Sequence, residues 1–218
     1  MQRPGHVWAN LTLELMIDWN VLAERFRGVY TATGKSWAPH VLRIDVDGVE
    51  FTVEEFTVSA HGAMAPINYD VFRIRAAYVS TDGFELELKK RGWLSSWLGG
   101  FRTGDPAFDE HFSVTTNDEA MAKRFFMAGA GYREQAAHGD ALRGRLVDHP
   151  WFRFKVEGPT GWANDPRFVE EARQLRHEQR GKLPADTEDA SMAIFICRLA
   201  LRQLQAIGSA TDGDPFRD

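Results

Sequence analysis

Strict alternation of apolar and polar residues marks six segments of the chain and is typical of strands with one buried face. The alternating segments cover residues 42–46, 49–53, 72–78, 84–88, 112–114 and 151–157. Because each segment has a polar face, together they predict an antiparallel sheet that is exposed to water on one side and covered on the other.

Turn-forming residues separate these strands and predict how they connect. Residues 47–48 and 82–83 are both Asp-Gly, and this dipeptide between two alternating segments predicts a tight hairpin turn. After the two glutamates at 54–55 the apolar positions change parity, which predicts a β-bulge. Residues 59–69 contain glycine and proline and are predicted to form a loop.

Apolar residues spaced three and four apart predict the helices. The predicted helices cover residues 19–26, 117–128, 132–146, 166–180 and 191–207. Asp18 is a candidate N-cap for the first helix, and a capping box at 116–119 begins the second. The last helix is the most apolar, so we expect it at the centre of the helical layer. Residues 182–190, which precede it, are expected to form a flexible linker.

Together these elements predict an α+β protein in which an antiparallel sheet of about five or six strands is covered on one face by helices. The chain has 218 residues, of which 44% are hydrophobic, and this is enough for a normal core. We expect a single domain over residues 1–218, with a sheet-rich part at 1–129 and a helix-rich part at 130–218 as the alternative division.

Composition narrows the classes of function. The net charge of -5 disfavours nonspecific binding to nucleic acid, because that binding depends on Lys and Arg at phosphates. The single cysteine, Cys197, excludes a disulfide within the chain and a zinc site built on several cysteines. Acidic residues interrupt the apolar start, so we expect no signal peptide and a cytoplasmic protein. No cofactor motif is present, and none is predicted.

The segment 89–112 holds the densest group of unusual residues. Three basic residues precede Trp93, Trp97 and Phe101, whose spacing gathers them into a short apolar cluster. This cluster is a candidate interaction surface for a protein partner or a second copy of the chain. Attachment to a membrane surface is a weaker alternative, because two turns of apolar residues rarely hold a protein on lipid. Packing of the cluster onto the sheet is the structural alternative, and we favour it.

Asp105, Asp109 and His111 are candidate ligands for a hard cation, or a candidate acid and base. If residues 109–111 continue a strand, Asp109 and His111 share one face. The same residues are also typical of a turn, because Asp105 precedes a proline. We favour the turn and keep a metal-dependent or acid–base site as the alternative.

The same segment carries a resemblance. Residues 103–109 (TGDPAFD), followed by Phe112, resemble a family of uncharacterised bacterial proteins with a Gly-Asp-x-x-Phe-Asp-x-x-Phe signature. Residues 19–23 and the tail at 204–210 are similar to further segments of that family. The resemblance implies one intact family domain of unknown function and brings no catalytic residue, ligand or partner with it.

Basic residues also recur on the polar faces of two predicted strands. Arg73, Arg75, Arg153 and Lys155 can line a sheet face that binds an anion, although a solvated polar face gives the same pattern and is favoured. No other catalytic motif is present. The leading hypothesis is therefore a non-catalytic binding or protein-interaction domain that binds no nucleic acid.

Overall fold

The computed structural model describes residues 17–34, 40–61, 66–92, 101–126, 133–158, 172–181, 184–211 and 215. The helices are α1 (Trp19–Phe26), α2 (Pro106–His111), α3 (Glu119–Phe126), α4 (Arg133–Asp148) and α5 (Thr187–Ala206). The strands are β1 (Val29–Ala32), β2 (His40–Val46), β3 (Val49–His61), β4 (Pro66–Ser80), β5 (Leu86–Lys90), β6 (Phe112–Thr116), β7 (Phe154–Glu157), β8 (Ala172–Arg180) and β9 (Ala210–Thr211).

All strands of the described ranges join one antiparallel sheet. Its order is β1-β2-β3-β4-β8-β7-β5-β6, and β9 pairs with β4. The predicted α+β class and antiparallel sheet are confirmed. The predicted number of strands was too small, because the sheet has nine. Strands β8 and β7 come late in the chain but lie between β4 and β5, so the sheet interleaves the two halves of the sequence.

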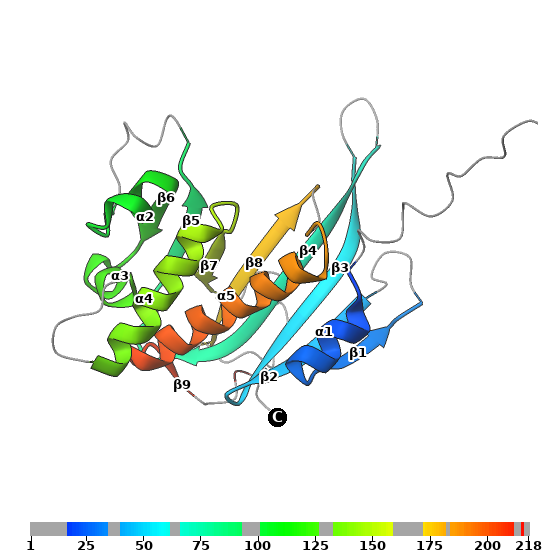
Figure 1. Ribbon diagram of the computed structural model, residues 1–218, viewed down its shortest axis with the longest axis horizontal. Coiled ribbons are helices and arrows are strands. Elements are labelled where there is room, and N and C mark those ends of the chain that lie inside the picture. Colours follow the sequence, from blue (N-terminus) through cyan, green and yellow to red (C-terminus); the bar gives the residue numbers. More distant parts are fainter. Residues whose placement is uncertain are drawn as a thin grey trace, which may run out of the picture.

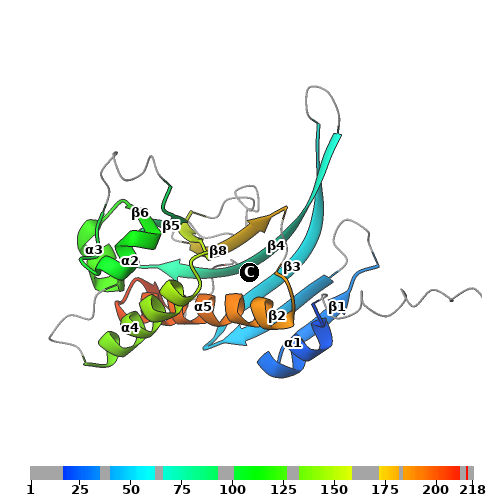
Figure 2. The same ribbon diagram turned by 45° about the horizontal axis from the view of Figure 1, so that its top comes forward.

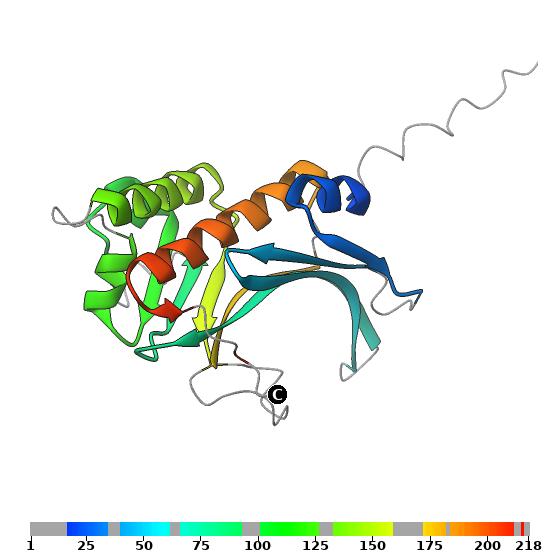
Figure 3. The same ribbon diagram turned by 90° about the horizontal axis from the view of Figure 1, so that it is seen from below.

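The helices lie together on one side of the sheet, and the opposite face carries none of them (Figure 3). Helix α5 crosses the covered face over the middle strands, and α4 runs beside it (Figure 1). Ile194, Cys197, Leu201 and Leu204 of α5 are all buried, as the apolar spacing predicted. Burial raises the pKa of the Cys197 thiol, so this residue is a small core side chain. Within the described ranges, no helix is both long enough and apolar enough to cross a membrane.

Helix α1 begins at the predicted N-cap. The Asp18 carboxylate accepts hydrogen bonds from the backbone N–H groups of Asn20 (3.0 Å) and Val21 (3.1 Å). Arg27, with φ of 54°, takes the left-handed conformation that ends the helix. Gly28, the next residue, lies where the backbone passes close to β2.

Replacing Gly28 by alanine is expected to destabilise the protein by about 2 kcal/mol. A Cβ atom there would lie 2.5 Å from the Arg43 carbonyl oxygen, which is backbone and cannot move aside alone. Gly144 in α4 is the matched control, because a Cβ there meets nothing within 4 Å. Gly144→Ala should stabilise the helix by about 0.5–1 kcal/mol. Urea unfolding of both variants measures the difference, and equal stabilities would contradict the close approach at Gly28.

The predicted hairpin at residues 82–83 is wrong. Strand β5 does not pair with β4, because β8 and β7 occupy the positions between them. The Asp82 carboxylate instead accepts hydrogen bonds from Phe84 N (2.9 Å) and from the Ser209 hydroxyl (2.9 Å). Asp82 therefore still forms the hydrogen bonds of a turn, but this local turn does not determine which strand pairs with β4.

The helix predicted at 166–180 is also wrong in its described part, which is strand β8. Residues before 172 in that prediction lie outside the described ranges. In β8, Leu175 and His177 point to the core, while Arg176 and Glu178 alternate onto the other face. The spacing of Ala172 and Leu175 is compatible with a helix, but pairing with both β4 and β7 determines the outcome.

The predicted bulge near residue 54 is not found. Of the loop predicted at 59–69, residues 59–61 and 66–69 belong to strands β3 and β4, and residues 62–65 lie outside the described ranges. The pairing of β3 with β2 and with β4 keeps one register throughout, and the two long strands extend to His61 and from Pro66. Their far ends curve away from the helical layer (Figure 2). Phe56 therefore sits on the polar face without a shift of register, with the Arg73 guanidinium 4.4 Å from its ring centre.

The linker predicted at 182–190 is partly helical. Residues 182–183 lie outside the described ranges, and α5 begins at Thr187 with Asp186 as its N-cap. The Asp186 carboxylate accepts a hydrogen bond from Asp189 N at 2.9 Å. The Thr187 hydroxyl accepts another from Asp18 N at 2.8 Å, so this helical turn is tied to the start of α1.

Candidate functional site

The segment with the family-like signature forms a short helix and the loop before it. Asp105 is the N-cap of α2, and its carboxylate accepts hydrogen bonds from Ala107 N (3.1 Å) and Phe108 N (3.3 Å). Pro106 occupies the first helical turn, where its missing N–H is tolerated. Residues 109–111 are therefore helical, and the strand that the sequence suggested there is wrong.

Asp109 closes the loop that precedes its own helix. Its side chain is buried and accepts hydrogen bonds from Thr103 N (3.0 Å), the Thr103 hydroxyl (2.9 Å) and Gly104 N (3.1 Å). Gly104 has a φ of 86°, in the region that favours glycine. The Thr-Gly-Asp of the signature is thus one hydrogen-bonded unit, in which the carboxylate bonds to the backbone.

His111 ends α2, and its carbonyl oxygen accepts a hydrogen bond from Arg91 N at 2.7 Å. Among the described residues, no three His, Cys, Asp or Glu side chains gather closely enough to hold a metal ion. Asp105 and Asp109 are bonded to separate backbone groups. An acid–base or metal site at Asp105, Asp109 and His111 stays a prediction, without such a ligand group among the described residues.

Of the predicted apolar cluster, Trp93 and Trp97 lie outside the described residues. Phe101 forms an isolated β-bridge with Val114 and packs, half-buried, against the core. This agrees with the expectation that the segment packs onto the sheet at this point. Its candidate role as an interaction surface stays a prediction.

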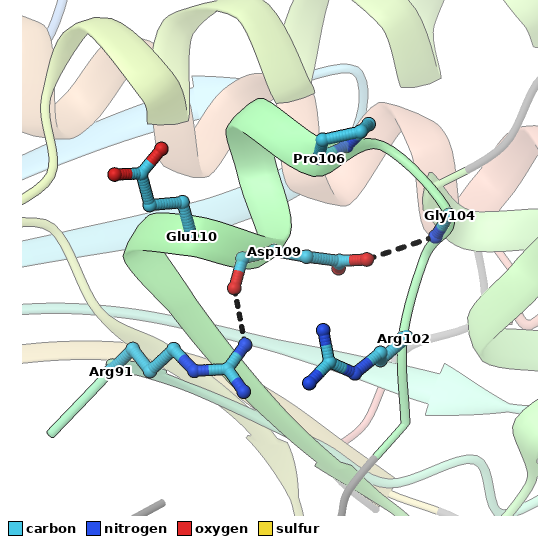
Figure 4. Close-up of a pocket in the computed structure, with 6 residues that line it drawn as sticks. All are labelled: Arg91, Arg102, Gly104, Pro106, Asp109 and Glu110. Carbon is cyan, nitrogen blue, oxygen red and sulfur yellow. Dashed lines mark hydrogen bonds between the residues drawn. The ribbon is translucent and has the colours of Figure 1, made fainter. Parts of the chain in front are cut away.

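A cavity of about 560 Å³ lies beside α2, and Figure 4 shows the residues that line it. The lining includes Arg91, Arg102, Asp109 and Glu110. The Arg91 guanidinium donates a hydrogen bond to the Asp109 carbonyl oxygen. The two guanidinium groups point toward each other across the cavity (Figure 4). We call this the two-arginine cavity.

A second and larger hollow lies where β5, β7 and β8 adjoin, and it has a volume of about 630 Å³. We call it the basic groove, and its lining is Glu87, Leu88, Lys89, Lys90, Trp151, Arg153, Phe154, Lys155, Arg176, Glu178 and Arg180. Six of these side chains are basic and two are acidic, which leaves a formal excess of four positive charges. The whole chain has a net charge of -5, so the groove is opposite in sign to the molecule that carries it.

The two carboxylates of the basic groove are already paired. Glu87 bonds to the ammonium groups of Lys89 (2.6 Å) and Lys155 (2.7 Å). Burial alone would raise the pKa of Glu87, but the two ammonium groups outweigh it and hold that pKa below its ordinary value. Glu178 bonds to Arg176 and Arg180 in the same way.

Two cations of the basic groove have no carboxylate partner among the described residues. Among the described residues, the exposed Arg153 guanidinium donates only to the Glu178 carbonyl oxygen, at 3.0 Å. Lys90 is exposed and forms no ion pair with any described carboxylate. These two residues carry positive charge that no described carboxylate neutralises.

Sequence reasoning found part of this surface. Arg153 and Lys155 line the groove, as the anion-binding alternative suggested. Arg73 and Arg75 lie on the same face of the sheet but outside the groove lining, and both bond to Glu54. The contribution of β8 was missed because a helix was predicted there. Arg176, Glu178 and Arg180 recur at every second position, which is the strand signal that could have identified it.

A buried histidine lies directly behind the groove. His177 of β8 stacks on Phe152 with ring centres 4.3 Å apart, and its Nδ1 lies 2.6 Å from the Arg153 carbonyl oxygen. Nδ1 must carry the proton, because a carbonyl oxygen only accepts. Nε2 is buried and has no hydrogen-bond partner among the described residues. Burial lowers the pKa of His177 to about 4, so the ring is neutral at pH 7.

Comparison of the chain with models of protein families, with curated proteins and with solved structures found no match. The resemblance of residues 103–112 to the bacterial family stays a prediction. The geometry and charge of the two hollows are therefore the features from which a function can be inferred.

Proposed function

We propose that this protein is a non-catalytic binding domain that holds an acidic segment of a protein partner in the basic groove. The observation that carries the proposal is the local reversal of charge, with four excess positive charges in the groove lining of a chain whose net charge is -5. Such a reversal attracts an anionic partner to one place while the rest of the surface repels it.

The spacing of the cations suits an extended polypeptide. Lys155 and Arg176 are register partners on neighbouring strands, so their Cβ atoms lie roughly 5 Å apart. Acidic residues at alternate positions of an extended peptide lie about 7 Å apart and face the same side. Long basic side chains can span the difference. Two such carboxylates can therefore reach two groove cations at once.

Trp151 gives the groove an apolar contact. It is half-buried and packs edge-on against Phe152, with ring centres 5.7 Å apart. Tryptophan next to arginine is the composition that binding hot spots favour. We therefore expect the acidic segment to place an apolar side chain beside its carboxylates.

The groove chemistry favours a polypeptide over nucleic acid. Glu87 and Glu178 lie among the cations, and they would repel a continuous line of phosphates. A peptide can place its carboxylates at separate positions and leave these two glutamates beside its uncharged residues. The acidic charge of the whole chain acts against nucleic acid in the same direction.

An acidic peptide that carries one aromatic residue should bind the full chain, and reversing the two unpaired groove cations should weaken that binding at least about tenfold. The variants are Lys90→Glu, Arg153→Glu and the double change. Fluorescence anisotropy of the labelled peptide measures the affinity. Binding should also weaken as salt is added, because the attraction is between exposed charges.

The matched control is Lys123→Glu, which makes the same change of charge on α3, outside the groove lining. Lys123 is exposed and forms no ion pair with a described residue. Its variant should bind the peptide as wild type does. Equal loss in Lys123→Glu and Arg153→Glu would mean that only overall charge matters, and the groove proposal would then be wrong.

A further inference from the structure

Arg91 and Arg102 place two positive charges in one cavity without a carboxylate between them. Arg102 is exposed and forms no hydrogen bond or ion pair with another described residue. Within the described ranges, Arg91 donates from its guanidinium only to the Asp109 carbonyl oxygen. The two guanidinium groups nonetheless point toward each other (Figure 4). Like charges that face each other repel, so an anion between them would be bound favourably.

The nearby carboxylates do not neutralise this pair. Asp109 lines the cavity, but its carboxylate accepts its three hydrogen bonds from Thr103 and Gly104. The Glu110 carboxylate points away from both guanidinium groups (Figure 4). No ion pair joins either arginine to a described carboxylate. The hydrogen bonds that close the Thr-Gly-Asp loop therefore leave the arginines available.

We propose that the two-arginine cavity binds a phosphate-type dianion, either free phosphate or the phosphate group of a monoester. A guanidinium presents parallel N–H donors that match two oxygens of one phosphate, and two guanidiniums can hold one dianion from two sides. The volume of about 560 Å³ exceeds what one phosphate needs, so a monoester with a small organic group can also enter. This site is separate from the basic groove and does not depend on the peptide proposal.

Isothermal titration of the full chain with inorganic phosphate, and separately with O-phosphoserine, tests the proposal at constant ionic strength. We expect saturable binding of at least one of the two. Arg102→Gln should weaken it at least about tenfold, because one bidentate partner is lost. Arg102→Lys should retain part of the affinity, since it keeps the charge but not the paired donors. Tighter binding of the ester identifies a monoester as the source, and equal binding identifies the phosphate group alone.

Arg153→Glu is the control that separates this site from the groove. It should leave phosphate binding unchanged, and Arg102→Gln should leave binding of the acidic peptide unchanged. The two proposals can therefore fail independently. No saturable response to either probe, or an Arg102→Gln variant that binds as tightly as wild type, would overturn the phosphate site.

Discussion

Acidification from pH 6.5 to about 4 is expected to remove about 3 kcal/mol of folding free energy through His177 alone. Burial lowers the pKa of this ring from its ordinary value of 6.5 to about 4 in the folded protein. Between these two pH values the His177 ring binds a proton in the unfolded chain but stays neutral in the folded protein. The contribution of His177 to the free energy of unfolding should therefore not change with pH above 6.5. It should fall as the pH drops from 6.5 toward 4.

The surroundings of His177 explain why a charged ring is so unfavourable there. Phe152 covers one face of the ring, and the rings of Phe72 and Trp151 approach from other directions at 6.3 and 6.2 Å. The Arg153 carbonyl oxygen stabilises a proton on Nδ1, but a second proton on Nε2 would find no acceptor in the described part of the chain. The positive charge of Arg153 lowers the pKa of His177 further, whereas the negative charge of Glu178 raises it.

Urea unfolding of wild type and His177→Gln at pH values from 4 to 8 measures this effect. Glutamine can still donate to the carbonyl oxygen but takes up no proton in this range. The two proteins should differ in the slope of unfolding free energy against pH below 6.5, and their slopes should agree above it. Carboxylates that do not interact with His177 affect both proteins alike and cancel in the comparison. Identical slopes throughout would show that His177 is not buried in its neutral form.

The position of His177 links this prediction to the basic groove. The His177 ring is hydrogen-bonded to the Arg153 carbonyl oxygen on the core side of the sheet. The Arg153 side chain lines the basic groove. Protonation of His177 would therefore disturb the contact of β7 with β8 on which the groove is built. A site that depends on these two strands should lose affinity in the same pH range in which the fold loses stability.

Local patterns in the sequence were sufficient for the elements whose faces are sharply divided. Alternation located β2, β4 and β7, and apolar spacing located α1 and α5. In each of these, one face is buried against the core and the other is mostly polar, so the period of the pattern follows the geometry. The Asp18 cap was identified for a similar reason, because it acts within its own turn of the chain.

Strand β8 was missed because its sequence is polar on both faces. Arg173 and His177 lie on the core side of the strand, where apolar residues are the usual signal. These positions are stabilised by partners far away in sequence, such as the Arg153 carbonyl for His177. Such partners leave no periodic trace in a single sequence. The groove was only partly predictable for the same reason, since its cations come from three separate stretches of the chain, residues 89–90, 153–155 and 176–180.

Asp109→Ala is expected to destabilise the protein by about 3 kcal/mol and to lower the melting temperature by about 10 °C. The change leaves the buried Thr103 N–H and hydroxyl and the Gly104 N–H without the carboxylate that accepts from them. Asp109→Asn should lower the free energy of unfolding by less than Asp109→Ala does, because the amide oxygen still accepts a hydrogen bond. It should still destabilise the protein, since the amide nitrogen is itself a donor and faces the donors that the carboxylate oxygen accepted from. Thermal and urea unfolding measure both variants.

Glu110→Ala is the matched control, because Glu110 is the next residue in α2, is exposed and forms no ion pair with a described residue. Its effect should stay within about 0.5 kcal/mol.

The comparison also separates the two hypotheses for the signature segment. A carboxylate kept for metal binding or acid–base chemistry is usually a cost to the fold, so its removal would leave stability unchanged or raise it. A large loss at Asp109, with no effect of divalent cations on the wild-type melting temperature, would instead make the Thr-Gly-Asp unit an architectural device that shapes the cavity beside it.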